Sequence, residues 1–333
     1  MNDTASDLTL WYAQPAQEWV EALPIGSGRL GAMVFGGVAA ERLQLNEDTL
    51  WSGGPRDWDN SGARDVLPEV RRLIAAGDYA AADARCREMQ GPYTQSYQPL
   101  GDLHLHFDHD APPADYRRDL DLSTALARVS YRVGDVTFRR EVFASAPDRV
   151  IAIRLTADRP GALTFTALLD TPHPHQIVCL EGADGLMLTG KVPAHVAPSY
   201  DRVPDPIIYD ADGEGMTFAV QIAVLPEGGR LVHGPAGLRV EGADAATILL
   251  VAATSFNGYD RSPAGMVATR WHTRRAISRR RGQSRSATCA PRTSRTMPRF
   301  SAVSTSTSGA PRPPTSRPTS ASAAGRRLMI RSW

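Results

Sequence analysis

A polar cluster beside an aromatic residue is the first feature of the chain that could take part in chemistry. Asn46, Glu47 and Asp48 follow one another, and Trp51 lies three residues further on. Amide and carboxylate groups next to an indole ring are expected where sugar hydroxyls meet a stacking surface. The same residues could instead form a structural hydrogen-bond cluster that closes a turn before Gly53-Gly54-Pro55. We favour the structural reading, and these four residues remain candidates for a site near a substrate or at an interface between domains.

A glycine-rich segment has the spacing of a phosphate-binding loop. Gly26, Gly28 and Gly31 follow a Gly-x-Gly-x-x-Gly pattern. Such a pattern holds a phosphate when it joins a buried strand to a helix, and the sequence predicts neither neighbour here. Glycine also permits turns and the close approach of two backbone segments. We predict turns in this segment rather than a nucleotide site.

Histidines occur in two pairs that could bind a metal ion or line a groove. His104 and His106 alternate with apolar residues, so both imidazoles should lie on one face of a strand, but no third ligand is evident. His173 and His175 are flanked by prolines and are predicted to be loop residues that could line a groove. Solvent-facing strand residues are the alternative for the first pair. We assign no metal ligand and no cofactor.

Cysteine usage and the N-terminus indicate the compartment. Cys86, Cys179 and Cys289 lack metal-ligand or redox spacing, which indicates unpaired thiols in a reducing compartment. Residues 1–10 contain two aspartates and no basic residue, unlike a secretory signal. No apolar run approaches the roughly 18–20 residues that a helix needs to cross a bilayer. The sequence therefore predicts a cytoplasmic protein that does not contact a membrane.

Strands are the elements that must position these residues. Runs of alternating apolar residues recur between Leu8 and Tyr259, broken by Gly and Pro at the intervals of an all-β domain. The clearest predicted strands cover residues 101–107, 127–133, 136–143, 150–155, 163–169, 216–222 and 247–252. Many strands of period two favour a β-sandwich or a larger double sheet. We predict a mainly β fold with two large sheets.

One segment departs from the strand pattern. Apolar residues Val66, Val70 and Leu73 fall at helical spacing, and Gly77 follows as a C-cap. The pattern predicts a small helical insertion of two short helices at about residues 63–90. We find no internal repeat in the chain.

The net charge of +1 hides two parts of opposite charge. All 36 acidic residues lie at or before Asp260 together with 21 basic residues, a net charge of −15. Residues 261–333 contain 16 arginines and no acidic residue, a net charge of +16. Ser, Thr, Arg, Pro and Ala dominate this tail without apolar periodicity, so it cannot bury enough surface to fold. We predict a β domain over residues 1–260 and a disordered Arg/Ser/Pro-rich tail over residues 261–333.

The tail could be a natural basic extension or the product of a shifted reading frame. Arg outnumbers Lys 36 to 1 in the chain, which is typical of a GC-rich gene, and such DNA read out of frame tends to yield Arg, Ser, Pro, Thr and Ala. Back-translation with GC-rich codons, read one base earlier, turns residues 289–309 into an amphipathic helix followed by a strand. The missing acidic residues return as well. We favour a frameshift near Gly265, which leaves the tail out of frame.

Several long segments of the first part resemble one enzyme family in family order. They are residues 8–37 with Leu-Pro-Ile-Gly-Ser-Gly-Arg-Leu-Gly, 41–55 with Asn-Glu-Asp-Thr-Leu-Trp-Ser-Gly-Gly-Pro, 97–103, 116–122, 139–145 and 255–260. Together they resemble the N-terminal domain of glycoside hydrolase family 95, the α-L-fucosidases. The resemblance covers nearly all of residues 8–260, and the frame-shifted tail is similar to the family's linker into a catalytic barrel.

The resemblance implies a fold and a reaction. The family's N-terminal domain is a two-sheet supersandwich, and its members are inverting exo-glycosidases acting on terminal fucose of oligosaccharides or plant glycans. Inversion requires two carboxyl-type groups about 6.5–9.5 Å apart. In the family, the general acid Glu and the water-activating Asn and Asp lie in a downstream (α/α)-barrel. No position of this chain matches them, so we assign no catalytic residue, and Glu47 and Asp48 do not take that role.

Three functions follow for the chain as written. The resemblance implies the N-terminal domain of a fucosidase-like enzyme, inactive alone because the catalytic barrel that meets the oligosaccharide is missing. The alternative is a carbohydrate-binding or domain-packing module that uses exposed aromatic residues such as Trp51, Tyr93, Tyr97 and Tyr200. A nucleic-acid contact through the Arg-rich tail is disfavoured by the −15 body, so we expect no nucleic-acid partner. If the barrel-facing surface is exposed, we expect self-association through it.

Overall fold

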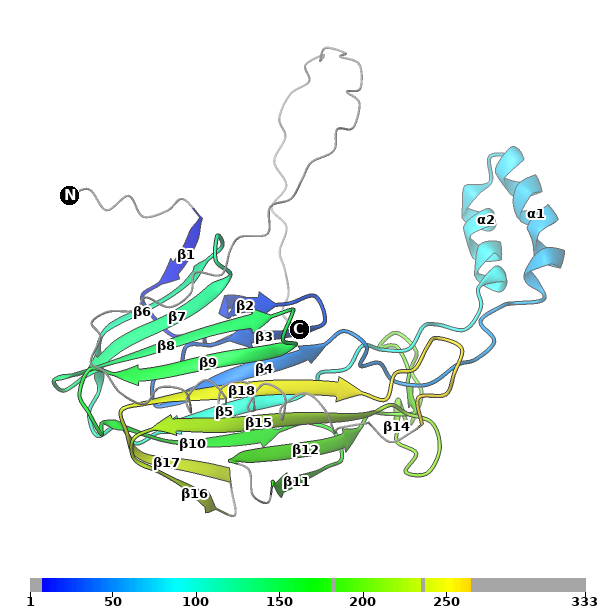
Figure 1. Cartoon of the computed structure of the whole chain (residues 1–333). Helices are drawn as coiled ribbons and strands as arrows, with labels where there is room; N and C mark the ends of the chain where they lie inside the picture. Colours follow the sequence, from blue (N-terminus) through cyan, green and yellow to red (C-terminus); the bar gives the residue numbers. More distant parts are fainter. Residues whose placement is uncertain (1–7, 181–183, 235–236, 265–333) are drawn as a thin grey trace, which may run out of the picture. The chain divides into compact units, whose positions relative to one another are not determined.

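Two antiparallel β-sheets form the body of the protein (Figure 1). The computed structural model describes residues 8–180, 184–234 and 237–264 of the 333-residue chain. The tail predicted to begin at residue 261, with Cys289 and the frameshift position near Gly265, therefore lies outside the described residues except for residues 261–264.

The larger sheet has nine strands in the order β1-β6-β7-β8-β9-β18-β15-β12-β11, and every neighbouring pair is antiparallel. Its strands are β1 (Thr9–Tyr12), β6 (Pro113–Asp121), β7 (Leu126–Val133), β8 (Val136–Ser145), β9 (Val150–Ala157), β18 (Ala245–Thr254), β15 (Thr217–Glu227), β12 (Gly185–Lys191) and β11 (His175–Cys179).

The smaller sheet has seven strands in the order β16-β17-β10-β5-β4-β3-β2. Its strands are β16 (Arg230–Gly234), β17 (Gly237–Ala243), β10 (Leu163–Asp170), β5 (Gly101–Phe107), β4 (Ala40–Glu47), β3 (Leu30–Val34) and β2 (Leu23–Gly26). A short pair, β13 (His195–Val196) and β14 (Ile207–Ile208), and the 3₁₀ turns η1 (Trp19–Glu21) and η2 (Arg87–Met89) complete the strands and turns.

The core lies between the two sheets and follows from the alternation of apolar side chains. Inward-facing residues such as Leu103 and Leu105 of β5 and Ile151 and Ile153 of β9 are fully buried in one apolar cluster that draws on both sheets. Each of the seven strands predicted from the sequence is present. The prediction of a mainly β, two-sheet sandwich is confirmed.

The helical insertion is present as a hairpin of α1 (Ala63–Ala75) and α2 (Tyr79–Cys86), which stands apart from both sheets in Figure 1. Gly77 has φ of 78° and ends the first helix, its N–H donating to the carbonyl of Ile74 at 3.0 Å. Asp78 then caps the second helix by accepting from the N–H of Ala81 at 3.1 Å. The predicted helices and the predicted Gly77 cap are confirmed.

Strand β4 carries two acidic residues on its buried face. Glu41, Leu43, Leu45 and Glu47 alternate toward the core, and none of the four is more than 2% exposed. A buried carboxylate is costly unless it is paired and hydrogen-bonded. Each of these two glutamates must therefore have partners brought by other strands.

Glu41 pairs with Arg140 of β8, which belongs to the opposite sheet. The second carboxylate oxygen of Glu41 accepts from the N–H of Gly36 at 2.8 Å, and Arg140 also donates to the carbonyl of Gly37 at 3.0 Å. The Arg140 guanidinium lies 4.7 Å from the ring centre of Phe107. The ion pair thus joins the two sheets inside the core.

A second buried guanidinium lies on β6 and uses backbone groups as partners. Arg118 is 1% exposed and donates to the carbonyls of Gln14 and Glu21 at 2.8 and 2.7 Å. Its guanidinium also lies 4.1 Å from the ring centre of Tyr12. These bonds attach the N-terminal segment between β1 and β2 to the nine-stranded sheet.

Removing one partner of the central ion pair should be strongly destabilising. We expect Glu41→Ala to lower the free energy of unfolding by about 3–5 kcal/mol, because Arg140 keeps a buried charge without its partner. Urea denaturation measures the change. Glu69→Ala, which removes an exposed partner of Arg72 on α1, is the control and should change the stability far less, because water screens this pair. Equal losses in the two variants would contradict a stabilising role for the buried pair.

Candidate functional site

Loops from several strands meet at one end of the sandwich, beside β14 in Figure 1. The N–H of Ser52 donates to the carbonyl of Ser96 at 2.9 Å, and the N–H of Gly53 donates to the carbonyl of Pro193 at 3.0 Å. We refer to these connecting segments, residues 48–62, 90–100, 192–216 and 255–264, as the loop end. The four residues predicted to form a site lie where β4 enters it.

Trp51 forms an exposed aromatic pair with Tyr97. The two residues are joined by an isolated antiparallel bridge, and their ring centres lie 5.4 Å apart at an interplanar angle of 73°. The Tyr97 hydroxyl lies 2.7 Å from both the side-chain oxygen of Asn46 and the carbonyl of Glu47, which share its single proton, and the indole N–H donates to the carbonyl of Asp48 at 3.3 Å. Trp51 is 44% exposed and Tyr97 is 38% exposed. The backbone of the polar cluster therefore holds both rings.

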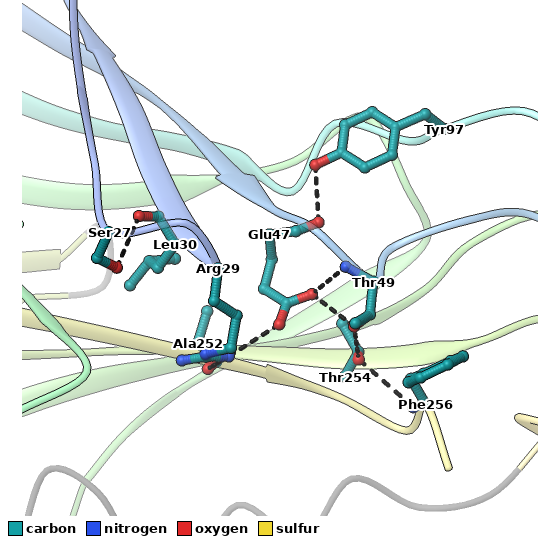
Figure 2. A network of polar contacts seen from close by, with 9 residues as sticks. All are labelled: Ser27, Arg29, Leu30, Glu47, Thr49, Tyr97, Ala252, Thr254 and Phe256. Carbon is teal, nitrogen blue, oxygen red and sulfur yellow. Dashed lines mark hydrogen bonds and ion pairs between the residues drawn. The ribbon is translucent and has the colours of Figure 1, made fainter. Parts of the chain in front are cut away.

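Glu47 turns away from this surface into a network that joins the two sheets (Figure 2). One carboxylate oxygen accepts from Arg29 at 2.8 Å, and the other accepts from the N–H and hydroxyl of Thr49 at 2.8 and 2.6 Å. Arg29 also donates to the carbonyl of Ala252 at 3.1 Å, and the hydroxyls of Thr49 and Thr254 lie 2.5 Å apart. We refer to these five residues as the clasp.

The clasp decides what the polar cluster can do chemically. Both oxygens of Glu47 have protein donors and the side chain is buried, so this carboxylate does not face a ligand. Asp48 and Asn46 are exposed beside the aromatic pair. Burial, together with the nearby Glu47 charge, raises the pKa of Tyr97, which keeps its hydroxyl neutral and able to donate. The exposed part of the cluster suits hydrogen bonding next to a stacking surface.

Two glycines after Trp51 allow the loops to approach one another. A Cβ on Gly53, which has φ of 78°, would lie 2.6 Å from Cγ of Gln95. A Cβ on Gly54 would lie 2.3 Å from a carboxylate oxygen of Glu214, which accepts from the hydroxyl of Ser262 at 2.8 Å. Gly53 is therefore favoured by its positive φ and by its close contact with Gln95, whereas the flexible end of Glu214 can move away from a side chain at position 54.

A directed chain of hydrogen bonds selects the tautomer of a neutral His195 ring. The side-chain oxygen of Gln95 accepts from the hydroxyl of Ser52 at 3.0 Å and from the N–H of Val196 at 3.2 Å. Its amide nitrogen must then donate to Nδ1 of His195, 3.1 Å away. Neutral His195 consequently carries its proton on Nε2, 3.0 Å from the hydroxyl of Tyr93. Tyr93 is left to donate outward.

His173 connects two further loops and is buried. Its Nε2 lies 3.0 Å from the carbonyl of Pro99, and its Nδ1 lies 3.0 Å from the hydroxyl of Tyr209. The carbonyl can only accept, so Nε2 carries the proton and Tyr209 donates to Nδ1. Burial lowers the pKa of His173, which favours this neutral form. The residue has a structural role in the loop that the sequence predicted.

The remaining histidines do not assemble into a metal site. His104 and His106 lie on the outer face of β5, with ring centres 6.2 Å apart, as their alternation predicts. His175 is the first residue of β11, so its prediction as a loop residue was wrong. Within the described ranges, no group of three His, Cys, Asp or Glu residues is placed to hold a metal ion.

None of the described helices is long and apolar enough to span a membrane.

The Gly-x-Gly-x-x-Gly segment is a β-hairpin. Gly26 ends β2 and Gly31 lies in β3, so a strand rather than a helix follows the glycines. The N–H of Ser27 donates to the carbonyl of Leu30 at 3.0 Å, and Gly28 has φ of 89°. The hairpin turn also carries Arg29 to the clasp, so the predicted turns are present and serve the contact between the sheets.

Sequence reasoning missed the partners of the polar cluster. Tyr97, Arg29 and Thr254 lie 51, 18 and 205 positions from the residues that they contact. One local signal was present, because alternation along β4 places Glu47 on the same face as Leu43 and Leu45. That pattern distinguishes the buried Glu47 from its exposed neighbours.

Comparison with known proteins assigns the fold to a family of carbohydrate-active enzymes. Residues 10–259 match the family model described as "Glycosyl hydrolase family 65, N-terminal domain". Among solved structures, a putative kojibiose phosphorylase from the human microbiome covers 84% of this chain at 8% identity and a TM-score of 0.39, a score too low to establish a common fold.

Curated relatives include fucosidases of a plant and of a fungus. The chain is 40% identical over 266 residues to "Alpha-L-fucosidase 2" of Arabidopsis thaliana, an alignment that covers 77% of this chain and 31% of the plant protein. It is 35% identical over 144 residues to "Probable alpha-fucosidase A" of Aspergillus niger, covering 41% of this chain and 18% of the fungal protein. The chain thus spans less than a third of the length of these relatives.

Neutralising the clasp carboxylate should loosen the loop end. We expect Glu47→Gln to lower the free energy of unfolding by about 2 kcal/mol, because an amide cannot replace all the charge-assisted bonds to Arg29 and Thr49. Hydrogen exchange should accelerate at residues 48–52 and 252–256. Asp48→Asn, an exposed change in the same turn, is the control, with an effect within about 0.5 kcal/mol. Equal effects of the two variants would argue against the clasp.

Proposed function

This chain belongs to the glycosyl hydrolase family 65 N-terminal domain family, and we propose that it is the N-terminal β-sandwich of an α-L-fucosidase-like exo-glycosidase. The observation that carries the proposal is the 40% identity to a plant protein named "Alpha-L-fucosidase 2" over 77% of the chain. The reaction that we propose for the whole enzyme is inverting hydrolysis of terminal fucose from oligosaccharides or plant glycans.

Within that broader group we assign the chain to glycoside hydrolase family 95. The assignment is supported by the names of the relatives and by the motif segments at residues 8–37 and 41–55, which follow the order of that family. The matching family model is named for family 65, so the assignment to family 95 is supported only by the names of the relatives and by the motif segments.

Catalysis is proposed to lie in the part of the relatives that this chain does not span. Inversion needs a general acid and a water-activating group across one bond. In the loop end, the carboxylate of Glu47 accepts hydrogen bonds from Arg29 and Thr49 of the clasp. Asp48 is exposed, and we assign no second carboxylate as its catalytic partner. The relatives are more than three times the length of the aligned region, which leaves room for a catalytic domain.

The loop end is the surface that we propose to face this catalytic domain. Trp51, Tyr97, Phe256 and Tyr259 are all exposed there, and an apolar surface of this kind is typical of an interface. The clasp anchors β18 immediately before residues 255–264, from which the chain continues. When the loop end is uncovered, we propose that it promotes self-association.

The basic tail is proposed to be the out-of-frame continuation of this enzyme. We expect the chain of 333 residues to release no fucose from an aryl α-L-fucoside, because we match no position of its sequence to the acid or the water-activating group of the family. Restoring one base near codon 265 should open a longer frame, and its product should release fucose with inversion, as followed by NMR of the sugar formed.

Two results would overturn this proposal. Fucose release by the purified 333-residue chain would place catalysis within it. An absence of any downstream open frame after resequencing from about codon 255 would remove the enzyme context and leave the tail as a natural extension.

A carbohydrate-binding module is the second candidate function. The observation that favours it is the fixed aromatic pair of Trp51 and Tyr97 beside exposed Asn46 and Asp48. Aromatic rings supply stacking area for the apolar faces of sugars, and neighbouring amide and carboxylate groups bond their hydroxyls. Such a site would hold a glycan without cleaving it.

Glycan binding should depend on the indole of Trp51. If the module binds fucosylated oligosaccharides, Trp51→Ala should weaken binding about tenfold, which corresponds to about 1.4 kcal/mol. Titration calorimetry after a glycan-array screen measures the change. Trp19→Ala removes an indole that is also exposed but lies outside the loop end, and it should leave affinity unchanged. Equal loss in both variants, or no binding by the parent chain, would reject this function.

A further inference from the structure

The loop end is an acidic surface that lacks its own counter-charges. It contains nine carboxylates against three arginines, whereas the other residues up to Asp260 contain 27 carboxylates and 19 basic residues. All nine carboxylates are exposed, and within the described residues none of them lies in an ion pair with an arginine or lysine. They are Asp48, Asp57, Asp59, Asp201, Asp205, Asp210, Asp212, Glu214 and Asp260. Such a surface attracts a segment of opposite charge.

Exposed aromatic rings lie among these carboxylates. Tyr200 is 78% exposed and Tyr259 is 91% exposed. Trp58 has the guanidinium of Arg56 5.4 Å from its ring centre, so one ring of the loop end already carries an arginine. No described guanidinium lies over Trp51, Tyr200 or Tyr259. These rings can accept further arginines, because a guanidinium is attracted to the face of an aromatic ring.

Exposed rings on β1 do not offer the same surface. The guanidinium of Arg117 lies 5.0 Å from the ring centre of Trp11, and that of Arg118 lies 4.1 Å from the ring centre of Tyr12. Both rings therefore already have an arginine. The combination of uncovered rings and unpaired carboxylates thus distinguishes the loop end from this edge of the sheet.

The chain leaves its described part within the loop end. The hydroxyl of Ser255 donates to the carbonyl of Pro263 at 2.5 Å, and the hydroxyl of Ser262 lies 2.8 Å from each carboxylate oxygen of Glu214. These bonds hold residues 262–263 against the other loops, so the chain continues from this surface. Residues 265–333 contain 15 arginines and no acidic residue, and seven of the arginines lie in residues 270–285.

This connection favours the chain's own basic segment over a second molecule. The first arginine, Arg270, lies six residues beyond Ala264, and six extended residues span about 20 Å. A segment linked by so short a connection has an effective concentration of about millimolar at the surface beside it. A second copy has to be recruited from solution, and its residues 1–260 carry the same net charge of −15.

We propose that residues 265–285 cover the loop end of their own chain, with arginines paired to its carboxylates and stacked on its aromatic rings. Arginine suits both contacts, because its planar guanidinium binds a carboxylate through two N–H groups and stacks on aromatic faces. The segment then occupies the surface that would self-associate when uncovered. The inference concerns the chain of 333 residues and does not depend on the proposed function, since the charges act in the same way whatever the origin of the tail.

A spin label on the tail tests this contact in the full chain. In a Cys86→Ser and Cys179→Ser background, a nitroxide on the native Cys289 lies four residues after Arg285. We expect it to weaken the amide signals of residues 200–212 and 256–260 about twofold or more in NMR spectra. The signals of residues 134–135, in the turn between β7 and β8 at the opposite end of the sandwich, should not change.

Salt and mixing identify the source of the broadening. At 1 M salt, where charges are screened beyond about 3 Å, the loop-end signals should recover. A mixture of the isotope-labelled Cys289→Ser chain with an unlabelled, spin-labelled chain reports only contacts between copies. We expect no loss of loop-end signal in this mixture, because the tail binds within its own chain.

Two matched double variants test which carboxylates matter. Asp201→Asn with Asp205→Asn removes two exposed charges from the loop end and should reduce the broadening about twofold. Asp110→Asn with Asp135→Asn removes two exposed charges at the opposite end and should leave the broadening unchanged. The same spectra show whether each variant keeps its fold, which the exposed positions allow.

The proposal fails on any of four results. Equal broadening at both ends of the sandwich would mean that the tail does not select the loop end. Equal effects of the two double variants, or broadening that 1 M salt leaves unchanged, would remove the role of the loop-end carboxylates. Broadening in the mixed sample as strong as in the spin-labelled chain alone would make the contact one between copies.

Discussion

Two buried carboxylates on one strand are the constraint on which the rest of the domain depends. β4 turns Glu41 and Glu47 toward the core on either side of two leucines, and a buried charge must be compensated. Glu41 is compensated by Arg140 of the opposite sheet, and Glu47 is held by Arg29 and by the threonines that lead to β18. A shift of β4 by one residue would separate both carboxylates from their partners, so these contacts fix its register.

The same constraint reaches the surface through the turn that follows β4. Because Glu47 is fixed by the clasp, the backbone at residues 47–48 offers its carbonyls at set positions to Tyr97 and Trp51. The exposed aromatic pair is therefore supported by the ion pair of the buried Glu47 carboxylate with the half-buried Arg29. A surface held in this way is suited to binding, because its side chains lose little further freedom when a partner arrives.

The described residues form a scaffold that carries one exposed polar and aromatic surface. These residues provide two sheets, a loop end joined by close glycine contacts and a helical hairpin that stands apart from both sheets. The α-fucosidases to which the chain is similar are more than three times as long as the region aligned with it. Residues 10–259 of this scaffold match the glycosyl hydrolase family 65 N-terminal domain.

The sequence by itself determined the strands and helices. Alternation of apolar residues along residues 101–107 and helical spacing before Gly77 are local patterns, because each element buries one of its faces. The sequence also indicated the N-terminal domain of a glycoside hydrolase, because ordered motif segments extend over most of the domain. Only the tertiary structure decided which member of Asn46, Glu47 and Asp48 is buried and what each contacts. The contacts are made by residues from distant strands and loops, namely Arg29, Tyr97 and Thr254. Local sequence patterns carry no information about such long-range contacts, because the packing of the two sheets determines them.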